Sequence, residues 1–332
     1  MIRRLIPVLA RIGAALAWCV AVLLAFGLVS GIENGPLAVA QILTPHLALA
    51  CLALVVVAVA SRSRALLIAL VAVLALFTGR FAGEWWSPPP AAGAAGAVEL
   101  RVLTWNLQAG ERAGADAVRM LGDHPVDIVA LQELTPEVAA AIEADPVLAA
   151  RFPHRALEAR AGVAGIGLLS RFPIETVDTA IEPVRLEARV RLSDRTLVVL
   201  NAHPFPARIG MLAGVPVGLD PTVRNRDLER LRSRVAELDA AGEDVLLIGD
   251  FNTAPTEPAF RRLTGGLHDA HAEVGLGPGW TWRPARFAFL GIGLLRIDLV
   301  LSTSALRPLT ASTRCPSTGD HCLVEAALSM EP

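Results

Sequence analysis

The sequence predicts an α/β protein in which two packed β-sheets are covered by helices, preceded by three membrane-spanning helices. Two observations lead to this prediction. The 332 residues are 53% hydrophobic, but the excess of apolar residues is concentrated before residue 98. From residue 98 onward, short apolar runs alternate with a few helical patterns. Eight or more strands with so few helices favour two packed sheets over one doubly wound sheet.

Three apolar segments lie in the first 97 residues, roughly from Ile12 to Ile32, from Leu37 to Ala60 and from Ala65 to Ala82. The first two reach the ~20 apolar residues that a bilayer crossing needs, and the third is slightly short. A signal peptide would explain the first segment only, and burial in a soluble core is the alternative to insertion. We therefore expect a membrane domain at 1–86, a Pro/Ala/Gly linker at 87–97 and a globular domain at 98–332.

The arginines set the expected orientation of the spans. Arg3, Arg4 and Arg11 precede the first span. Arg62 and Arg64 lie between the second and the third. Because cytoplasmic loops carry the excess of basic residues, we expect a cytoplasmic N-terminus and an extracytoplasmic globular domain. All 30 basic residues are arginine, which is typical of a GC-rich bacterial genome, so the expected location is the bacterial inner membrane.

Residues 98–332 have the composition of a slightly acidic globular domain. They carry 24 arginines and 30 acidic residues, a formal charge of −6. The chain contains no tyrosine, which excludes any mechanism that needs a phenol. Short apolar runs predict strands and a 3.6-residue periodicity predicts helices. The expected strands are 100–105, 128–132, 165–170, 185–192, 197–201, 245–248, 297–301 and 322–328, and the expected helices are 113–121, 136–142 and 222–240.

The most informative motif is Gly249-Asp250-Phe251-Asn252, which follows the apolar strand at 245–248. It presents an acid and an amide at the C-terminal end of a strand, where α/β proteins bind ligands. A carboxylate there can hold a metal or take a proton from water, and the amide can orient that water. Four other fragments place polar residues at strand ends in the same way: Thr104-Trp105-Asn106, Gln132-Glu133, Asn201-Ala202-His203 and Asp320-His321.

Together with Leu169-Ser170-Arg171 and Arg296-Ile297-Asp298, these fragments resemble the endonuclease/exonuclease/phosphatase superfamily in their order and content. The resemblance covers essentially all of residues 98–332. It implies a four-layer sandwich of two mixed β-sheets flanked by helices, and metal-dependent hydrolysis of a phosphodiester by an activated water. The alternative is a non-catalytic membrane receptor or scaffold that retains the fold. One departure is Cys322-Leu323 after His321, where the family often has a proline.

The resemblance implies a metal site made of Glu133, Asn106 and Asp320. Mg²⁺ is the expected cofactor, with Mn²⁺ as a substitute, because Mg²⁺ prefers carboxylates, waters and substrate phosphate. Asn106 would also contact the phosphate, and Asn201 would assist it. From the residues alone, Glu133 could equally cap the helix that begins near Thr135, and Asn106 could be a turn residue.

The resemblance also implies a catalytic set. Asp250 would position and deprotonate the attacking water, and Asn252 would hold it. His203 would donate to a phosphoryl oxygen or to the leaving oxygen. Asp298 would orient His321 and raise its basicity. A charged Asp298 inside an apolar strand is costly unless it is paired, and this favours a functional role independently of the resemblance.

The expected substrate is a phosphate ester, either of a nucleic acid or of a phospholipid headgroup, and no protein partner is inferred. Strong nucleic-acid binding usually needs a basic face, which a domain with a charge of −6 does not suggest. The apolar loops at 205–219 and 287–295 adjoin His203 and Asp298. They either cover the core or dip into the lipid bilayer.

Cys315 and Cys322 bracket Asp320-His321 within eight residues. Outside the cytoplasm such a pair can form a disulfide that stiffens the catalytic loop, and we expect this bond. Cys19 and Cys51 lie in the apolar spans and are expected to act as small packing residues.

Overall fold

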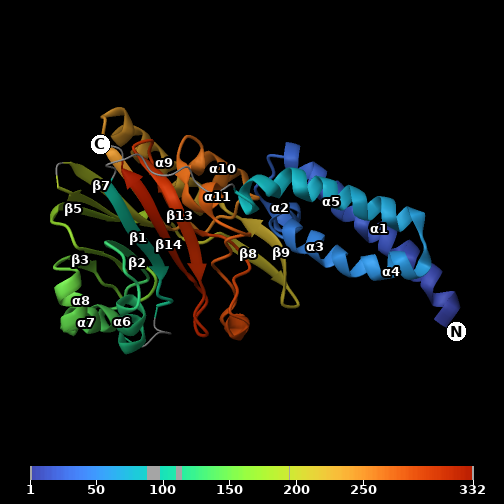
Figure 1. The fold of residues 1–332 in the computed structure, drawn as a ribbon, viewed down its shortest axis with the longest axis horizontal. Helices are drawn as coiled ribbons and strands as arrows, with labels where there is room; N and C mark the ends of the chain where they lie inside the picture. The colour runs from blue at the N-terminus through green and yellow to red at the C-terminus, as the bar shows by residue number, and fades with distance from the viewer. Residues whose placement is uncertain (1, 88–97, 110–113, 194, 331–332) are drawn as a thin grey trace. The chain divides into compact units, whose positions relative to one another are not determined.

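The computed structural model describes residues 2–87, 98–109, 114–193 and 195–330 (Figure 1). The chain divides into two compact units. The first comprises residues 1–83, 208–221 and 255–258, and the second comprises residues 84–207, 222–254 and 259–332. Apart from Ser87, the linker expected at 87–97 lies outside the described residues, so its conformation stays a prediction.

The first unit contains apolar helices: α1 (Ile2–Val29), α2 (Gly35–Ile42), α3 (Thr44–Ala50), the 3₁₀-helix η1 (Cys51–Ala53), α4 (Leu54–Ser61) and most of α5 (Arg64–Trp85). In the described residues, three stretches are long and apolar enough to cross a membrane: Ile6–Val29, Thr44–Ser61 and Arg64–Trp85. The second span is thus shorter than the expected 37–60. A break at Leu43 separates α2 from α3, and Pro45, which lacks an amide hydrogen, occupies the first turn of α3.

A polar contact ties three of these helices together. The Arg80 guanidinium on α5 donates a hydrogen bond to the Gln41 side chain on α2 at 3.1 Å. Gln41 in turn donates to the carbonyl of Leu23 on α1 at 2.9 Å. A Cβ at Gly27 would overlap the ends of both polar side chains as they lie in this contact. The contact places α2 beside the C-terminal part of α1.

The expected apolar loop at 205–219 is instead a β-hairpin over most of its length. Strands β8 (Arg208–Leu212) and β9 (Val215–Asp220) pair antiparallel, and β9 packs against α2 within the first unit. Ala213 and Gly214 form the tight turn with φ values of 48° and 79°. Positive φ at both central residues is the turn geometry that matches the twist of a two-residue hairpin. In the second unit, the apolar run at 287–295 includes part of a 3₁₀-helix, η2 (Ala285–Leu290), and leaves Phe289 and Ile292 exposed.

The second unit contains two six-stranded mixed sheets. In each sheet one pair of neighbours is parallel, β1 with β2 and β7 with β10, and the other pairs are antiparallel. The first sheet has the order β13 (Leu306–Arg314), β14 (Leu323–Met330), β1 (Val98–Asn106), β2 (Ile128–Gln132), β4 (Ile166–Ser170), β3 (His154–Glu158). The second has the order β11 (His268–Asp269), β12 (Asp298–Ser302), β10 (Asp244–Asp250), β7 (Thr196–His203), β6 (Val184–Arg191), β5 (Ile174–Ile181).

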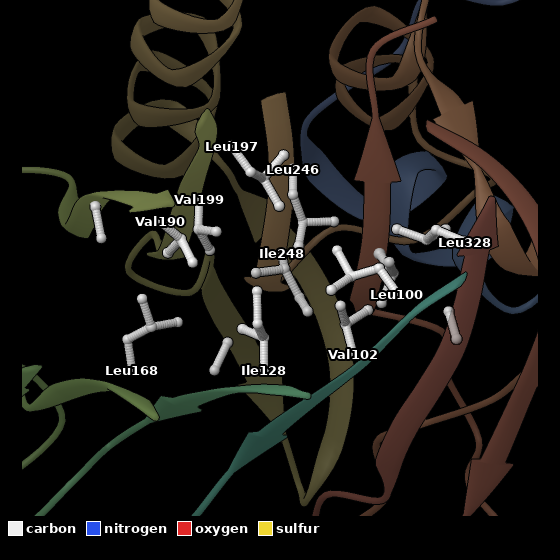
Figure 2. Packing of buried hydrophobic residues seen from close by; sticks show 14 of the residues in the cluster. Leu100, Val102, Ile128, Leu168, Val190, Leu197, Val199, Leu246, Ile248 and Leu328 are labelled. Atoms are coloured by element: carbon white, nitrogen blue, oxygen red, sulfur yellow. The ribbon is translucent and has the colours of Figure 1, made fainter. Parts of the chain in front are cut away.

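The two sheets face each other across a dry apolar core (Figure 2). Alternate residues of each strand point into this core, as the two-residue period of a strand requires. The first sheet contributes residues such as Val102 and Ile128, and the second contributes residues such as Val199 and Ile248. All four are fully buried, so the inter-sheet core fixes how the two sheets lie against each other.

Helices cover the outer faces of both sheets, which completes four layers and confirms the expected sandwich. On the first sheet, apolar residues of three helices share a core with Trp105 and Leu131. On the second sheet, two helices pack in the same way against Leu200 and Leu247. The covering helices are α6 (Gly114–Gly122), α7 (Pro136–Ala144) and α8 (Pro146–Arg151), then α9 (Thr222–Ala240) and α10 (Pro258–Thr264), and a further short helix is α11 (Ala270–Val274).

Candidate active site

The polar fragments expected from the sequence meet at one edge of the two sheets. Asn106 ends β1, and Glu133 follows β2. On the facing sheet, His203 ends β7 and Asp250 ends β10. Because β1 and β2 run parallel, as do β7 and β10, the carboxyl ends of all four strands can converge at this edge.

Asp250 lies at the centre of the cluster and is fully buried. One carboxylate oxygen accepts a hydrogen bond from the Asn106 amide at 3.0 Å, and the other accepts the backbone N–H of Asn252 at 2.9 Å. The preceding Gly249 has φ 145°, and a Cβ there would overlap the Ala202 carbonyl of β7. Only glycine permits this approach of the two strands, which explains the residue before the acid in the motif.

Glu133 is held in a fixed direction by its backbone and by two hydrogen bonds. Its φ is 53°, in the left-handed region that non-glycine residues rarely adopt. One carboxylate oxygen accepts from the Asn106 amide at 3.0 Å, and the other accepts from the backbone N–H of Ala109 at 2.8 Å. Asn106 therefore bridges the carboxylates of Glu133 and Asp250, and so links the two sheets.

His203 presents one ring nitrogen to both acids. Its Nδ1 lies 3.1 Å from the Val163 carbonyl and donates to it. This leaves Nε2 facing Glu133 at 3.7 Å and Asp250 at 3.6 Å. Asn252 has φ 52°, and its amide donates to the Pro204 carbonyl at 3.0 Å.

Asp298 and His321 form the other half of the cluster. Asp298 is the first residue of β12 and lies opposite Asp250 in the antiparallel register. Its carboxylate receives the Nδ1–H of His321 at 3.0 Å, and Nε2 of the same ring lies 3.6 Å from Asp250. The Thr281 hydroxyl oxygen accepts the backbone N–H groups of both Ile297 and Asp298, which holds the start of β12 in place.

Burial and the charges in this cluster raise the pKa values of two residues, Asp250 and His321. Burial raises the pKa of Asp250 to about 6, and the negative Asp298 adds to the rise although His321, His203 and Asn106 oppose it. Burial by itself would lower the pKa of His321. The negative Asp298 and Asp250 outweigh it and raise the pKa of His321 to about 10. The imidazole therefore carries a positive charge at neutral pH before any cation is bound.

Replacing Asp298 with Asn is expected to lower the pKa of His321, because the negative charge of Asp298 raises this pKa more than any other neighbouring charge does. The proton that His321 now keeps up to about pH 10 would leave at lower pH. The alkaline limb of the pH–rate profile should then move to lower pH, and turnover at neutral pH should fall. A pH titration of the histidine ¹⁵N signals in metal-depleted protein would follow the shift directly. Asp239→Asn, on the exposed side of α9, is the control and should leave the pH–rate profile unchanged. If the alkaline limb of Asp298→Asn stays at the wild-type pH, Asp298 does not set the pKa of His321.

The oxygen-rich side of the cluster suits a hard cation. One carboxylate oxygen of Asp320 is buried and has no hydrogen-bond partner among the described residues. Burial raises the pKa of Asp320, His321 lowers it, and the negative Glu133 and Asp298 raise it further, so Asp320 faces other carboxylates. Carboxylate and amide oxygens are the ligands that Mg²⁺ and Mn²⁺ favour. Glu133, Asn106 and Asp320 therefore fit a divalent cation.

A second group has metal-ligand spacing. One ligand atom from each of Asp250, Asp298 and His321 lies within 4.8 Å of the others. However, His321 Nδ1 already donates to Asp298, and Asp250 already accepts from Asn106. These hydrogen bonds explain the spacing without an ion.

Asn201 lies deeper than the other polar residues. Its amide hydrogens are donated to the Leu131 and Gly167 carbonyls, and its oxygen accepts from Gln132 at 2.7 Å. It thus fastens the second sheet to the first directly behind the cluster. Gln132 also exchanges hydrogen bonds with Thr104. This role could not be predicted, because a glutamine at a strand end has no distinctive pattern.

Three residues outside the set named above support the cluster. Gln108, with φ 54°, accepts the backbone N–H of Asp320 through its side chain at 3.1 Å. Arg224 is buried and donates to the Asn252 carbonyl at 2.8 Å, and Thr281 is the third. Arg171 instead pairs with Asp127, at the end of β2 opposite to Glu133. Because arginine is frequent in this chain, the burial of Arg224 distinguishes it better than its place in the sequence.

The expected disulfide is confirmed: Cys315 and Cys322 are bonded, with Cα atoms 4.1 Å apart. The loop that it closes carries both Asp320 and His321. Arg283 donates hydrogen bonds to the Pro316 carbonyl and to Cys322 sulfur. The loop that carries Asp320 and His321 is therefore held at both ends by covalent and polar contacts.

Replacing Cys315 and Cys322 with serine is expected to lower both stability and turnover. Closing an eight-residue loop stabilises a fold by about 2–3 kcal/mol in the chain-entropy view. Turnover should fall because the released loop no longer fixes Asp320 and His321 against Gln108. Thermal unfolding and initial rates of the full chain in detergent would measure both effects. Cys19→Ser, at an exposed free cysteine, is the control. Equal rates in the double variant and the wild type would contradict the expected loss of turnover.

A comparison with family models matches residues 103–321 to the Endonuclease/Exonuclease/phosphatase family. The match covers the whole cluster and about two thirds of the chain. This chain belongs to that family. As a member of the Endonuclease/Exonuclease/phosphatase family it is a hydrolase of phosphoester bonds. The family's dependence on divalent metals agrees with the oxygen-rich side of the site.

Solved structures of the same superfamily share the fold at low sequence identity. D. rerio TDP2 complexed with a single-strand DNA product is 17% identical, with a TM-score of 0.55, covering 69% of this chain and 98% of that one. A 3′-5′ exonuclease from Neisseria meningitidis is 21% identical, with a TM-score of 0.52 and coverages of 68% and 98%. A family protein from Bacteroides thetaiotaomicron is 14% identical, with a TM-score of 0.52 and coverages of 71% and 96%. A search of curated proteins finds no match.

Proposed function

We propose that this family member is a membrane-anchored, extracytoplasmic phosphodiesterase that uses Mg²⁺ and hydrolyses its substrate by in-line attack of water. The observation that carries the proposal is the buried carboxylate of Asp250. One of its oxygens accepts a hydrogen bond from Asn106 and lies 3.6 Å from a ring nitrogen of both His203 and His321. An acid that faces two imidazoles and an amide can take a proton from water beside groups that stabilise developing negative charge.

Each residue of the cluster has a role in this reaction. Asp250 accepts the proton of the attacking water, and its raised pKa makes it a better base than an ordinary aspartate. The positive His321, held by Asp298, stabilises the charge that develops on the phosphoryl oxygens. His203 presents Nε2 to the same region and can protonate the leaving oxygen. Asn252 orients the water.

Glu133, Asn106 and Asp320 would hold the cation, and Asn106 would also contact the phosphate. When bound there, the cation would supply Lewis-acid chemistry: it would polarise a phosphoryl oxygen and neutralise charge on the phosphate. Asn106 holds the carboxylates of Glu133 and Asp250 at a fixed distance from each other through two hydrogen bonds. Asn201 lies behind the cluster and fixes the ends of β2 and β7 against each other. In this way it would hold the residues that bind the substrate.

Three features support an anchored enzyme outside the cytoplasm. Three helical stretches have the length and composition of membrane spans. The arginines favour a cytoplasmic N-terminus, and three crossings then leave the catalytic domain at 98–332 on the other side. The Cys315–Cys322 disulfide agrees with an oxidising compartment, since cytosolic thiols are kept reduced. The domain boundaries at 86 and 98 belong to the same proposal.

The names of two structures with the same fold support a phosphodiester as the substrate class. The D. rerio structure holds a single-strand DNA product, and the Neisseria protein is named as an exonuclease. Hydrolysis would add water across one P–O bond and release an alcohol and a phosphate monoester.

The test uses the purified full chain in detergent with Mg²⁺ or Mn²⁺, against plasmid DNA, RNA, phospholipid vesicles and a soluble chromogenic phosphodiester. Turnover of at least one substrate, abolished by EDTA and restored by Mg²⁺, is the expected result. Turnover that EDTA leaves unchanged would contradict the metal assignment. A reporter enzyme active only outside the cytoplasm, fused after residue 62 or after residue 332, tests the orientation: we expect activity in the second fusion alone.

A further inference from the structure

The β8–β9 hairpin has no polar side chain between its two ends. Residues 209–219 read Ile-Gly-Met-Leu-Ala-Gly-Val-Pro-Val-Gly-Leu, and charged residues return only at Arg208 and Asp220. The apolar side chains near the turn are exposed: Met211 by 58%, Leu212 by 68% and Val215 by 57%. The paired residues Leu212 and Val215 lie on one face of the ribbon, and the next pair, Met211 and Pro216, lies on the other. The tip therefore offers apolar surface in every direction.

The rest of the same unit indicates what covers this surface. Strand β9 packs against α2, which lies between the first and second candidate spans. The Arg80–Gln41–Leu23 contact places α2 beside the C-terminal part of α1. The hairpin is thus attached to the end of the apolar helices that follows the first crossing. In the proposed orientation this end faces the outer leaflet.

The exposed apolar side chains and the open strand edges of the hairpin together suit the boundary between lipid headgroups and acyl chains. A two-stranded ribbon that packs on one helix and exposes apolar side chains around its turn is marginal in water. Its outer edges also carry unpaired backbone groups, which rules out deep insertion into hydrocarbon. At the boundary, the side chains of the tip can enter the acyl region while headgroups and water bond the open edges. Arg208 and Asp220 at the base suit the polar side of this boundary.

The chain joins the hairpin directly to the candidate active site at both ends. Arg208 follows His203 by five residues, which can extend at most about 18 Å. Pro204, next to His203, accepts the hydrogen bond of the Asn252 amide. On the other side, Arg224 follows Asp220 by four residues and donates to the Asn252 carbonyl. Short chain segments therefore join both ends of the hairpin to the groups that would act on the substrate.

We propose that the β8–β9 hairpin rests in the outer leaflet of the bilayer and that the active site hydrolyses a phosphodiester of a membrane phospholipid. The inference rests on the proposed function and names its substrate class. The formal charge of −6 on residues 98–332 agrees with it, since a nucleic acid would favour a basic domain. Water attacks phosphorus and one P–O bond breaks. The leaving alcohol takes the proton, and the products are an alcohol and a phosphate monoester, one of which keeps the acyl chains.

The position of the hairpin can be measured without any enzymatic activity. A nitrobenzoxadiazole fluorophore is attached at Leu212→Cys in a Cys19→Ala/Cys51→Ala background, and the full chain is reconstituted in phosphatidylethanolamine–phosphatidylglycerol vesicles. We expect blue-shifted emission that lipids brominated on the upper acyl chain quench. The matched control is Val147→Cys, an equally exposed apolar position on α8, which should emit as in water. Water-like, unquenched emission from position 212 would overturn the proposal.

The substrate class is tested by comparing two substrates in the same proteoliposomes. Leu212→Asp/Val215→Asp should reduce hydrolysis of the vesicle phospholipids at least tenfold and leave a soluble chromogenic phosphodiester within twofold. Val147→Asp should affect neither. An equal loss on both substrates would overturn the proposal, because the hairpin would then serve the fold.

The outcomes separate this inference from the proposed function. If the wild type hydrolyses the soluble ester or DNA but no vesicle phospholipid, the lipid substrate is wrong and the phosphodiesterase stands. If the wild type hydrolyses nothing, the proposed function fails together with the lipid substrate. The fluorophore at position 212 then still decides whether the hairpin lies in the bilayer.

Discussion

Asp250→Asn is expected to reduce turnover by about 10²–10⁴-fold, the contribution of a well-placed general base. The amide cannot take a proton from water. Its NH₂ group must also face either the Asn106 amide or the Asn252 N–H, both of which are donors. Initial rates with the soluble chromogenic phosphodiester and saturating Mg²⁺ measure the effect.

The comparison needs a control on the same strand. Asp244 begins β10, at the end opposite to the cluster, and Asp244→Asn should keep near-normal turnover. Because Asn is nearly isosteric with Asp, Asp250→Asn should still fold, and unfolding temperatures of the two variants will show this. A folded Asp250→Asn protein with more than a tenth of the wild-type rate would remove Asp250 from the role of base.

Glu133→Gln is expected to weaken metal binding and turnover together. Even partners that only touch metal ligands change affinity by about 10–100-fold, so the loss of a ligating carboxylate should be at least that large. The new amide also places a donor against either the Asn106 amide or the N–H of Ala109. Titration of the full chain with Mn²⁺, followed by electron paramagnetic resonance, measures affinity separately from catalysis.

Glu137→Gln is the matched control, since Glu137 lies four residues later on the exposed face of α7. It should bind Mn²⁺ and turn over substrate as the wild type does. A Glu133→Gln protein that binds Mn²⁺ normally would place the cation elsewhere, and the group of Asp250, Asp298 and His321 would then become the candidate. A receptor or scaffold would keep its function in this variant, so the same experiment separates that alternative.

The central strands and the chemistry at their ends could be predicted from sequence because both leave short-range signals. A strand buried on both faces is a continuous apolar run, and Ile128–Gln132 was predicted to the residue. The helix at Thr222–Ala240 was also predicted to the residue, since its apolar positions repeat at the helical period. The four-layer architecture then followed from the count and order of these elements and from the family resemblance.

The edges of the sheets were missed because they carry no such signal. Strand β5 is exposed along most of its length, so its residues do not alternate between apolar and polar. Strand β13 contains Pro308 and a bulge, both of which argue against a strand when read locally. The hairpin at 208–220 reads as an apolar loop because its packing partner is α2, a segment about 170 residues earlier in the chain.

The residues of the site could be named from the sequence, but their connections could not. The bridge from Asn106 to both Glu133 and Asp250 joins positions up to 144 residues apart and needs the packing of two sheets. Asn201 was expected to assist at the phosphate, and the structure shows its amide fastening the sheets together instead of pointing outward. A side chain's direction at a strand end depends on tertiary contacts, and these are not visible in the local pattern.

The left-handed backbone of Glu133 also affects the stability of the fold. For a residue other than glycine, asparagine or aspartate, this conformation costs of order 1 kcal/mol or more, and glycine would relieve it. In this turn the Glu133 carboxylate is aimed at Asn106 and at the N–H of Ala109. Backbone energy alone would favour glycine at position 133, so the turn gives up some stability and holds a carboxylate in a fixed direction.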